Sequence, residues 1–335
     1  MIPNKKRILT GIKATGVHIG NWVGAIEPAL VLANDPNNES FLFIADYHAL
    51  NSNPKPEVLK QNVYEIAATW LALGLDPKKT FLYRQSDIPE IFELSVILNS
   101  LTPKGFMNRA HAYKAQVQDN STKGNEDLDD GVNMGLFTYP ILMTADILIF
   151  NADQVPVGPD NVQHLEIARD IAQKFNSTYG DTFKLPSVLL PKKVKLLPGL
   201  DGRKMSSSYG NHIPVFLDEK SLRKSIMKIV SDSTAAEEPK STKDNLLFDF
   251  YSVFASPEQI KIMAEKYQNG IGWGFVKQEI FEVLNERLKG PRQVFNDLMA
   301  DKPQLDQILT RGALGARELA SKKLTEVRLK IGLTR

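Results

Sequence analysis

Two polar segments of the chain combine residue types that bind phosphate. Residues 10–25, TGIKATGVHIGNWVGA, place small residues around His18 and Asn21. We predict that this segment leaves a strand and opens a helix, so that backbone N–H groups and the helix dipole face an anion. Residues 203–211, RKMSSSYGN, set two cations before three hydroxyls. Taken singly, either segment also fits an ordinary turn, the first next to a core histidine and the second in solvent.

A third group of residues recurs at the spacing of one helix face. Its members are Tyr139, Met143, Asp146 and Phe150. A carboxylate on such an apolar stripe is costly unless it is paired, so a cap or a salt bridge is the simplest role for Asp146. Asp160 similarly fits a cap of the helical pattern that follows it.

Strand and helix patterns alternate in the first half of the chain and must position these residues. Strands are predicted over 7–12, 41–46, 80–85 and 187–191, and helices over 56–74 and 160–175. This alternation is typical of βαβ units on a parallel sheet. Ligands of such sheets bind beyond the carboxyl ends of the strands, where loops lead into helices.

Changes in composition divide the chain into two parts. The polar stretch 115–131 is predicted to be a mobile insertion, and 231–245 a linker or crossover. The sequence after this linker is almost purely helical. We therefore predict an α/β domain over 1–209 and an all-helical domain over 210–335, and leave open a return of the chain to the first domain at the C-terminus.

The composition excludes several classes of protein and of site. The chain of 335 residues contains no cysteine, which excludes a disulfide framework, a thiolate zinc site and a cysteine nucleophile. Its apolar runs are too short to span a bilayer, and its first residues lack the apolar core of a signal peptide. We expect a cytoplasmic protein without a membrane partner.

The two polar segments, in this order, resemble the HIGH and KMSKS motifs of class I aminoacyl-tRNA synthetases. Residues 43–51, 143–176 and 245–255 resemble segments of bacterial tryptophanyl-tRNA synthetases, and the resemblance covers nearly the whole chain. It implies a Rossmann-like catalytic domain, a helical anticodon-binding domain and a homodimer. The implied activity ligates L-tryptophan to tRNA(Trp) in two steps. ATP first forms tryptophanyl-adenylate with release of pyrophosphate, and the amino acid then moves to the terminal adenosine of the tRNA.

The resemblance also implies roles for individual residues. The catalytic residues are His18, Asn21, Lys204, Ser206 and Ser208. The ATP-binding residues are Lys13, Ala14, Thr15, Gly20, Asn21, Gly158, Pro159, Asp160, Leu197, Lys204, Met205, Ser206, Ser207 and Ser208. The tryptophan-binding residues are Leu9, His48, Tyr139, Met143, Asp146, Val155, Val157 and Asn161, with Asp146 accepting the indole N–H. Mg²⁺ is carried by ATP and has no site of its own on the protein.

Three departures from the family pattern concern the predicted site. Ser207 replaces the second lysine of KMSKS, Asn161 stands where glutamine is common, and the loop over 13–17 is one residue short. Lys13 or Arg203 can restore the missing charge. The alternatives left open are a tyrosyl-tRNA synthetase, a small-molecule nucleotidylyltransferase and a non-charging paralogue that binds ATP or tRNA.

The basic residues near the C-terminus also have two possible roles. A helix is predicted over 316–331, with an apolar stripe that leaves Arg317, Lys323 and Arg328 on the opposite side. These cations either solvate the helix or contact tRNA phosphates.

Overall fold

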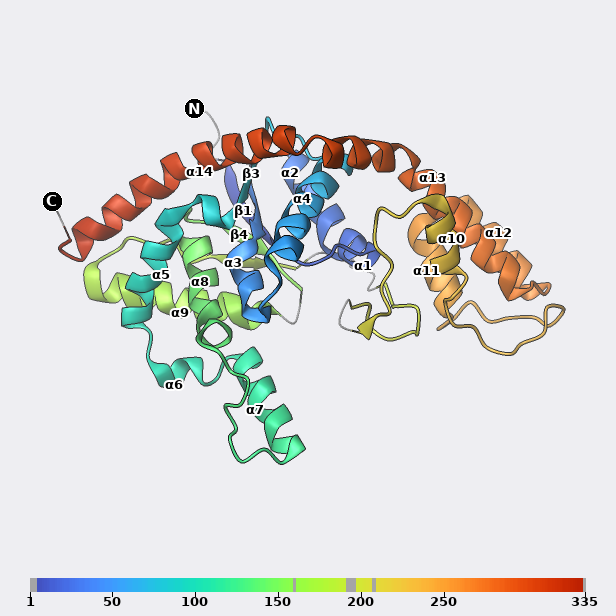
Figure 1. The fold of residues 1–335 in the computed structure, drawn as a ribbon, viewed down its shortest axis with the longest axis horizontal. Coiled ribbons are helices and arrows are strands. Elements are labelled where there is room, and N and C mark those ends of the chain that lie inside the picture. Colours follow the sequence, from blue (N-terminus) through green and yellow to red (C-terminus); the bar gives the residue numbers. More distant parts are fainter. Residues whose placement is uncertain (1–4, 159–160, 191–196, 207–208, 334–335) are drawn as a thin grey trace.

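A five-stranded parallel sheet forms the centre of the molecule in the computed structural model (Figure 1). The structure describes residues 5–158, 161–190, 197–206 and 209–333. The strands are β1 (Lys6–Lys13), β2 (Asn38–Ala45), β3 (Phe81–Arg84), β4 (Gln154–Pro156) and β5 (Ser187–Leu189), in the order β3-β2-β1-β4-β5. The α/β prediction is confirmed, and the four predicted strands correspond to β1, β2, β3 and β5. β4 was not predicted.

Helices surround this sheet and make up the rest of the fold. In the first part of the chain they are α1 (Ile19–Asn21), α2 (Glu27–Asn34), α3 (Asp46–Ala49), α4 (Pro56–Ala72), α5 (Pro89–Leu101), α6 (Lys104–Met107), α7 (His111–Lys123), α8 (Met134–Leu148) and α9 (Val162–Tyr179). In the later part they are α10 (Glu219–Ile226), α11 (Leu246–Phe254), α12 (Pro257–Gln268), α13 (Trp273–Ala300) and α14 (Lys302–Lys330). A π-helical turn over Trp22–Ile26 and 3₁₀ turns over Leu50–Ser52 and Gln85–Asp87 connect several of them.

Both faces of the sheet are covered by apolar side chains. Successive side chains of a strand point to opposite faces, and β2 follows this rule. Leu42 and Ile44 pack in a core with residues of α2, α4 and α13. Phe41 and Phe43 pack in a second core with residues of α5, α8 and α9. The nearly continuous apolar run of β2 is therefore the pattern of a strand buried on both sides.

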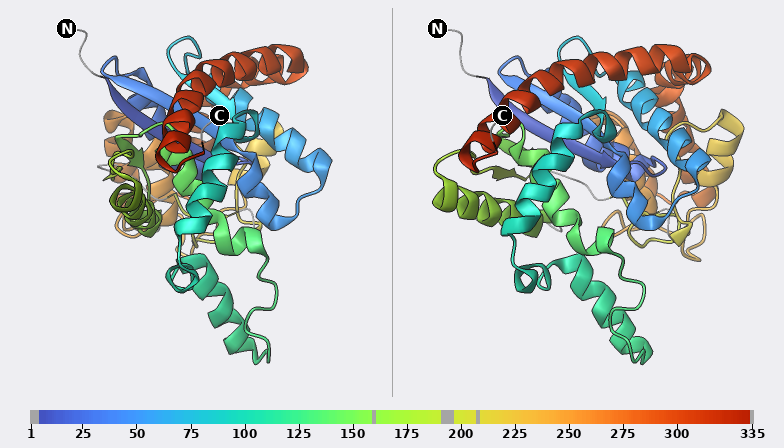
Figure 2. Two further views of the ribbon diagram at one scale, coloured as in Figure 1. Left: turned by 90° about the vertical axis from the view of Figure 1, so that its left-hand side faces the viewer. Right: turned by 60° about the vertical axis from the view of Figure 1, so that its left-hand side comes forward.

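The polar stretch that we predicted to be a mobile insertion is partly helical. α7 includes its first nine residues and projects with the following loop from the body of the molecule (Figures 1 and 2). Asn120 is buried, and its amide donates hydrogen bonds to the carbonyl oxygens of Leu128 and Asp130. A buried polar side chain thus ties the loop to the helix, although few apolar residues are available to do so.

The last helix, α14, returns across the top of the sheet (Figure 1). Ala316, Ala320, Leu324 and Val327 join the core that contains Phe41 and Phe43. Gly312 approaches β3 so closely that a Cβ atom there would lie 2.0 Å from the carbonyl oxygen of Leu82. α14 therefore rests directly on the edge strand of the sheet.

Candidate active site

The first polar segment opens a helix at the carboxyl end of β1. His18 is the N-cap of α1, and its Nδ1 accepts the Asn21 backbone N–H at 3.2 Å. The Asn21 side-chain oxygen accepts the His18 backbone N–H at 3.1 Å, which completes a reciprocal cap. Burial, together with the charge of nearby His212, lowers the pKa of His18 to about 4. At neutral pH the imidazole is uncharged, and because Nδ1 is an acceptor, Nε2 carries the proton and is a donor.

The second polar segment contacts the first. The Ile19 N–H donates to the carbonyl oxygen of Ile213 at 2.9 Å, so the chain that follows the serine loop runs beside the start of α1. A Cβ on Gly20 would lie 3.3 Å from Met205 Sδ and 3.0 Å from His18 Nδ1. The two segments, which are far apart in the sequence, are therefore brought together as predicted for one phosphate-binding site.

Asn211 organises the loop that carries Lys204. This side chain is 4% exposed, and its amide donates to Asp201 Oδ1 at 2.7 Å and to the Lys204 carbonyl oxygen at 3.1 Å. Its oxygen accepts the Ser206 backbone N–H at 2.8 Å. Hydrogen bonds from Asn211 and then from Arg203 lower the pKa of Asp201 to about 2. Arg203 is thus paired with a carboxylate, which makes it a poor replacement for the missing lysine of the motif.

The other predicted ATP-binding residues that the structure describes lie at strand ends, in the core beside α1 or in exposed loops. Lys13 ends β1, and its Nζ donates to Ser52 Oγ at 2.9 Å. Desolvation lowers the pKa of Lys13. Ala14, Leu197 and Met205 share the core that supports α1, Thr15 is exposed, and Gly158 follows β4. The predicted residues Pro159, Asp160, Ser207 and Ser208 lie outside the described residues.

A second cluster of predicted residues surrounds a buried carboxylate on α8. Asp146 is 1% exposed, and its Oδ2 lies 2.9 Å from His48 Nε2. The Gln85 side-chain amide donates to Oδ1 at 2.9 Å and to Oδ2 at 3.0 Å. Burial raises the pKa of Asp146, and the hydrogen bonds from His48 and Gln85 oppose that rise. A buried carboxylate needs hydrogen-bond partners, and Asp146 has two. His48 was predicted as part of this site, whereas Gln85 was not.

Of the remaining predicted tryptophan-binding residues, one contacts a partner of this carboxylate, four lie in the apolar core that includes residues of α8, and one is exposed. The Tyr139 ring packs edge-on against His48, with centroids 6.3 Å apart, and its hydroxyl is hydrogen-bonded to His164. Leu9, Met143, Val155 and Val157 belong to the same apolar core as Ala145. Asn161 is exposed at the start of α9, and its backbone N–H donates to the Gly158 carbonyl oxygen at 3.0 Å. α8 ends at Leu148, so Phe150 does not continue its face as we predicted; it packs on Phe41.

Comparisons with known proteins agree with this geometry. Residues 3–289 match the family described as tRNA synthetases class I (W and Y). The tryptophan–tRNA ligase of Neisseria meningitidis is 50% identical over 331 residues, covering 98% of both chains. That of Pseudomonas putida is 49% identical, covering 98% of this chain and 74% of the relative. The solved tryptophanyl-tRNA synthetase of Campylobacter jejuni complexed with ADP and tryptophan superposes with a TM-score of 0.88 at 41% identity, covering 98% of this chain and all of that one. The chain belongs to the tryptophan–tRNA ligases.

Gln85 belongs to the cluster around Asp146 but was not predicted from the sequence. It comes directly after β3, and the carboxyl ends of parallel strands are where ligands of such sheets bind. The prediction of a strand over 80–85 therefore contained a signal that we did not use. A single glutamine does not form part of a helical or strand pattern, so its place directly after a strand of the parallel sheet is the signal that identifies it.

Three basic residues of α14 contact the α/β part of the chain. Arg317 binds Glu90 with an N–O distance of 3.0 Å, and Arg328 pairs with Glu93, both acids being on α5. Lys323 donates to the carbonyl oxygen of Thr182 at 2.9 Å. These three cations fasten α14 to the sheet domain, which is a third role beside the two that we had considered.

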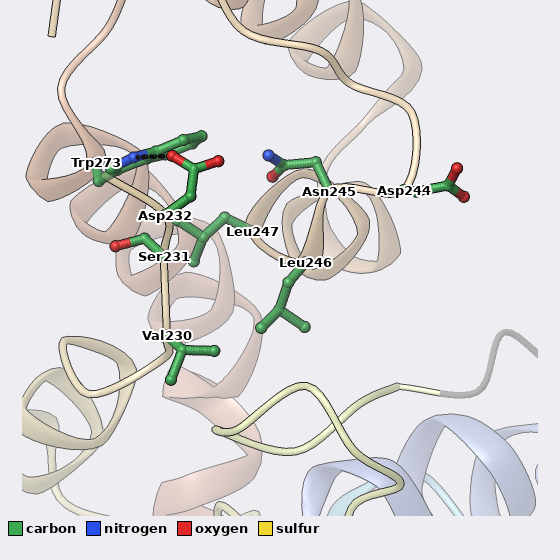
Figure 3. Close-up of a pocket in the computed structure, with 8 residues that line it drawn as sticks. All are labelled: Val230, Ser231, Asp232, Asp244, Asn245, Leu246, Leu247 and Trp273. Carbon is green, nitrogen blue, oxygen red and sulfur yellow. Dashed lines mark hydrogen bonds between the residues drawn. The ribbon is translucent and has the colours of Figure 1, made fainter. Parts of the chain in front are cut away.

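A separate cavity of about 190 Å³ lies in the helical part (Figure 3). It is bounded by the loop over 230–232 and by the starts of α11 and α13. Asp232 accepts the Trp273 indole N–H at 3.0 Å, and Figure 3 shows Asp232 and Asn245 pointing toward each other across the space.

No helix of the described chain is long and apolar enough to cross a membrane.

Proposed function

We propose that the cluster around Asp146 binds L-tryptophan and that the segments over 13–21 and 197–206 bind ATP. In the first step a tryptophan carboxylate oxygen forms a bond to the α-phosphorus of ATP, and the bond to pyrophosphate breaks. In the second step a ribose hydroxyl of the terminal adenosine of tRNA(Trp) attacks the activated carbonyl carbon, and AMP leaves. A relative that is 50% identical over 98% of this chain is named a tryptophan–tRNA ligase, which supports the overall reaction.

The observation that carries the choice of substrate is the buried carboxylate of Asp146. His48 and Gln85 occupy part of its acceptor capacity, and the acceptor direction that remains suits a single N–H donor. Tryptophan brings an indole N–H, whereas phenylalanine brings no donor and tyrosine places its hydroxyl elsewhere. Binding either competitor would leave a desolvated carboxylate without its last partner.

The phosphate end of the proposed site works by positioning and charge stabilisation. The tryptophan carboxylate is already a nucleophile, so no general base is required. The neutral His18 ring has a donor at Nε2, and Lys204 supplies a cation to the pyrophosphate as negative charge builds on it. Asn211 holds the backbone on both sides of Met205, which supports a defined position for that cation.

In this proposal Mg²⁺ binds together with ATP and is coordinated by the nucleotide. The described residues contain no group of three or more His, Asp or Glu side chains able to hold a metal ion. When bound, the cation would neutralise charge on the triphosphate through phosphate oxygens. The protein's own contribution then remains with His18, Asn21 and Lys204.

The other parts of the proposal rest on the resemblance to the family. We propose that the catalytic domain covers 1–209 and that the helical domain over 210–335 binds the anticodon region of tRNA(Trp). The loop bases of a tRNA can be unstacked and bound one by one, which suits a surface of helix ends and loops. We further propose a cytoplasmic homodimer.

Transfer of labelled amino acid to tRNA tests the proposed function. The purified chain is incubated with ATP, Mg²⁺, tRNA(Trp) and either tryptophan or tyrosine. We expect tryptophan to become acid-precipitable on tRNA(Trp), with tyrosine at background. Charging by tyrosine would identify a tyrosyl-tRNA synthetase, and charging by neither amino acid would indicate a non-charging paralogue.

A further inference from the structure

Gln85 is a fully buried polar side chain beside Asp146 in the proposed tryptophan-binding cluster. It is 0% exposed, and its amide nitrogen lies within 3.0 Å of both oxygens of Asp146. Because an ionised carboxylate only accepts hydrogen bonds, the amide must turn its N–H₂ end toward Asp146. The orientation of this side chain is therefore fixed by chemistry as well as by packing.

The hydrogen bonds of Asp146 leave one of its oxygens with spare capacity. A carboxylate offers about four lone-pair directions, two on each oxygen. Among the residues that the structure describes, Oδ2 receives both His48 Nε2 and the Gln85 amide, whereas Oδ1 receives the Gln85 amide alone. The free acceptor direction of the carboxylate is consequently on Oδ1.

Contacts on both sides hold the turn that carries Gln85. The preceding residue, Arg84, binds Asp306 of α14 and lies 3.6 Å from Asp87. The following residue, Ser86, donates its backbone N–H to Asp46 Oδ1 at 3.1 Å, and its hydroxyl bonds the same carboxylate. Neighbours from α14 and from the start of α3 thus restrict the backbone at Gln85, which is a condition for a side chain that must orient another.

We propose that Gln85 is a positioning residue for substrate selection: it holds the Asp146 carboxylate so that Oδ1 is presented to the indole N–H of tryptophan. This inference rests on the proposed tryptophan pocket. Gln85 acts through Asp146 and takes no part in the reaction at the phosphate. Its loss is expected to impair recognition of the N–H donor while leaving the chemistry of adenylate formation intact.

A substrate pair that differs only in the donor tests this role. β-(3-Benzothienyl)-L-alanine has the shape of tryptophan but carries sulfur in place of the indole N–H. Activation is measured by ATP–pyrophosphate exchange for both amino acids with wild type and with Gln85→Met. The matched control is Tyr83→Phe, which removes a fully buried hydroxyl from the strand before Gln85; this hydroxyl has no hydrogen-bond partner among the described residues.

We expect Gln85→Met to raise the Michaelis constant for tryptophan about tenfold or more, with that for ATP unchanged. The preference for tryptophan over the benzothienyl analogue should fall by a similar factor, and Tyr83→Phe should keep it. If Gln85→Met weakens both substrates equally, or keeps the wild-type preference, Gln85 does not act through the N–H contact. Wild-type enzyme that does not activate tryptophan at all would instead overturn the proposed function itself.

Discussion

Replacing Asp146 by asparagine separates its role in substrate selection from its role in stability. The change keeps the size of the side chain but removes its charge and replaces one carboxylate oxygen by an N–H₂ group. The neighbours His48 and Gln85 are themselves hydrogen-bond donors, so this N–H₂ group finds no acceptor in them. A hydrogen bond to a charged acceptor contributes about 1.5–3 kcal/mol. Its loss should lower kcat/KM for tryptophan by roughly tenfold to a hundredfold.

The free energy of unfolding should change only moderately in this variant. Burial raises the pKa of Asp146, which means that the folded protein disfavours the charged form relative to water. Removing the charge relieves that penalty and offsets the lost hydrogen bonds from His48 and Gln85. The net change is therefore expected to stay within about 1–2 kcal/mol, small enough for the variant to remain folded.

The assay is ATP–pyrophosphate exchange over a range of tryptophan concentrations, with denaturant unfolding measured on the same preparations. Asp153→Asn is the matched control, because Asp153 is also a bonded carboxylate but is held by the Arg7 backbone N–H and Lys184. It should keep the wild-type kcat/KM for tryptophan. An Asp146→Asn enzyme within threefold of wild type would refute the indole-binding role, as would an equal loss of apparent affinity for ATP.

Three further predictions concern the phosphate-binding segments. Lys204→Ala should slow adenylate formation by roughly 30-fold to 1,000-fold, measured by single-turnover kinetics, while tryptophan binding, measured by equilibrium dialysis, is kept. A loss of rate below about threefold would exclude a catalytic role for Lys204. Asn211→Ala removes the bonds to Asp201, Lys204 and Ser206, so it should also lower the single-turnover rate, and unchanged kinetics would show that the loop holds its shape without it. The pKa of His18 is lowered to about 4 from an ordinary value near 6.5, so the unfolded chain takes up a proton first as the pH falls through this window. The free energy of unfolding should therefore decrease from pH 6.5 to pH 4 more steeply in wild type than in His18→Gln. The same dependence of this free energy on pH in both proteins would contradict the burial of a neutral imidazole at His18.

Much of the fold could be predicted because its signals are local. β2 is a run of apolar residues, α4 and α9 have helical periodicity, and the cap that opens α1 joins His18 and Asn21, which are only three positions apart. β4 was missed because its three residues, Gln154–Pro156, contain one apolar side chain followed by a proline, which disfavours a strand prediction, whereas the equally short β5 lies in an apolar run.

The missed features depend on contacts between distant parts of the chain. The pairing of Gln85 with Asp146 joins residues 61 positions apart, and that of Arg317 with Glu90 joins residues 227 positions apart. Nothing near Arg317 in the sequence distinguishes a cation that binds α5 from one that faces solvent. The partner appears only when α14 lies against the sheet, so the third role of these basic residues could not be derived from their pattern.

The most direct test of the central claim is the relative activation of tryptophan, tyrosine and phenylalanine by the wild-type chain. ATP–pyrophosphate exchange is measured for each amino acid at limiting concentration to obtain kcat/KM. A site that presents one carboxylate oxygen to an indole N–H predicts a preference for tryptophan on the order of 10⁴ or more over phenylalanine, with tyrosine also strongly disfavoured. Comparable efficiencies for tryptophan and phenylalanine, or a preference for tyrosine, would contradict the account.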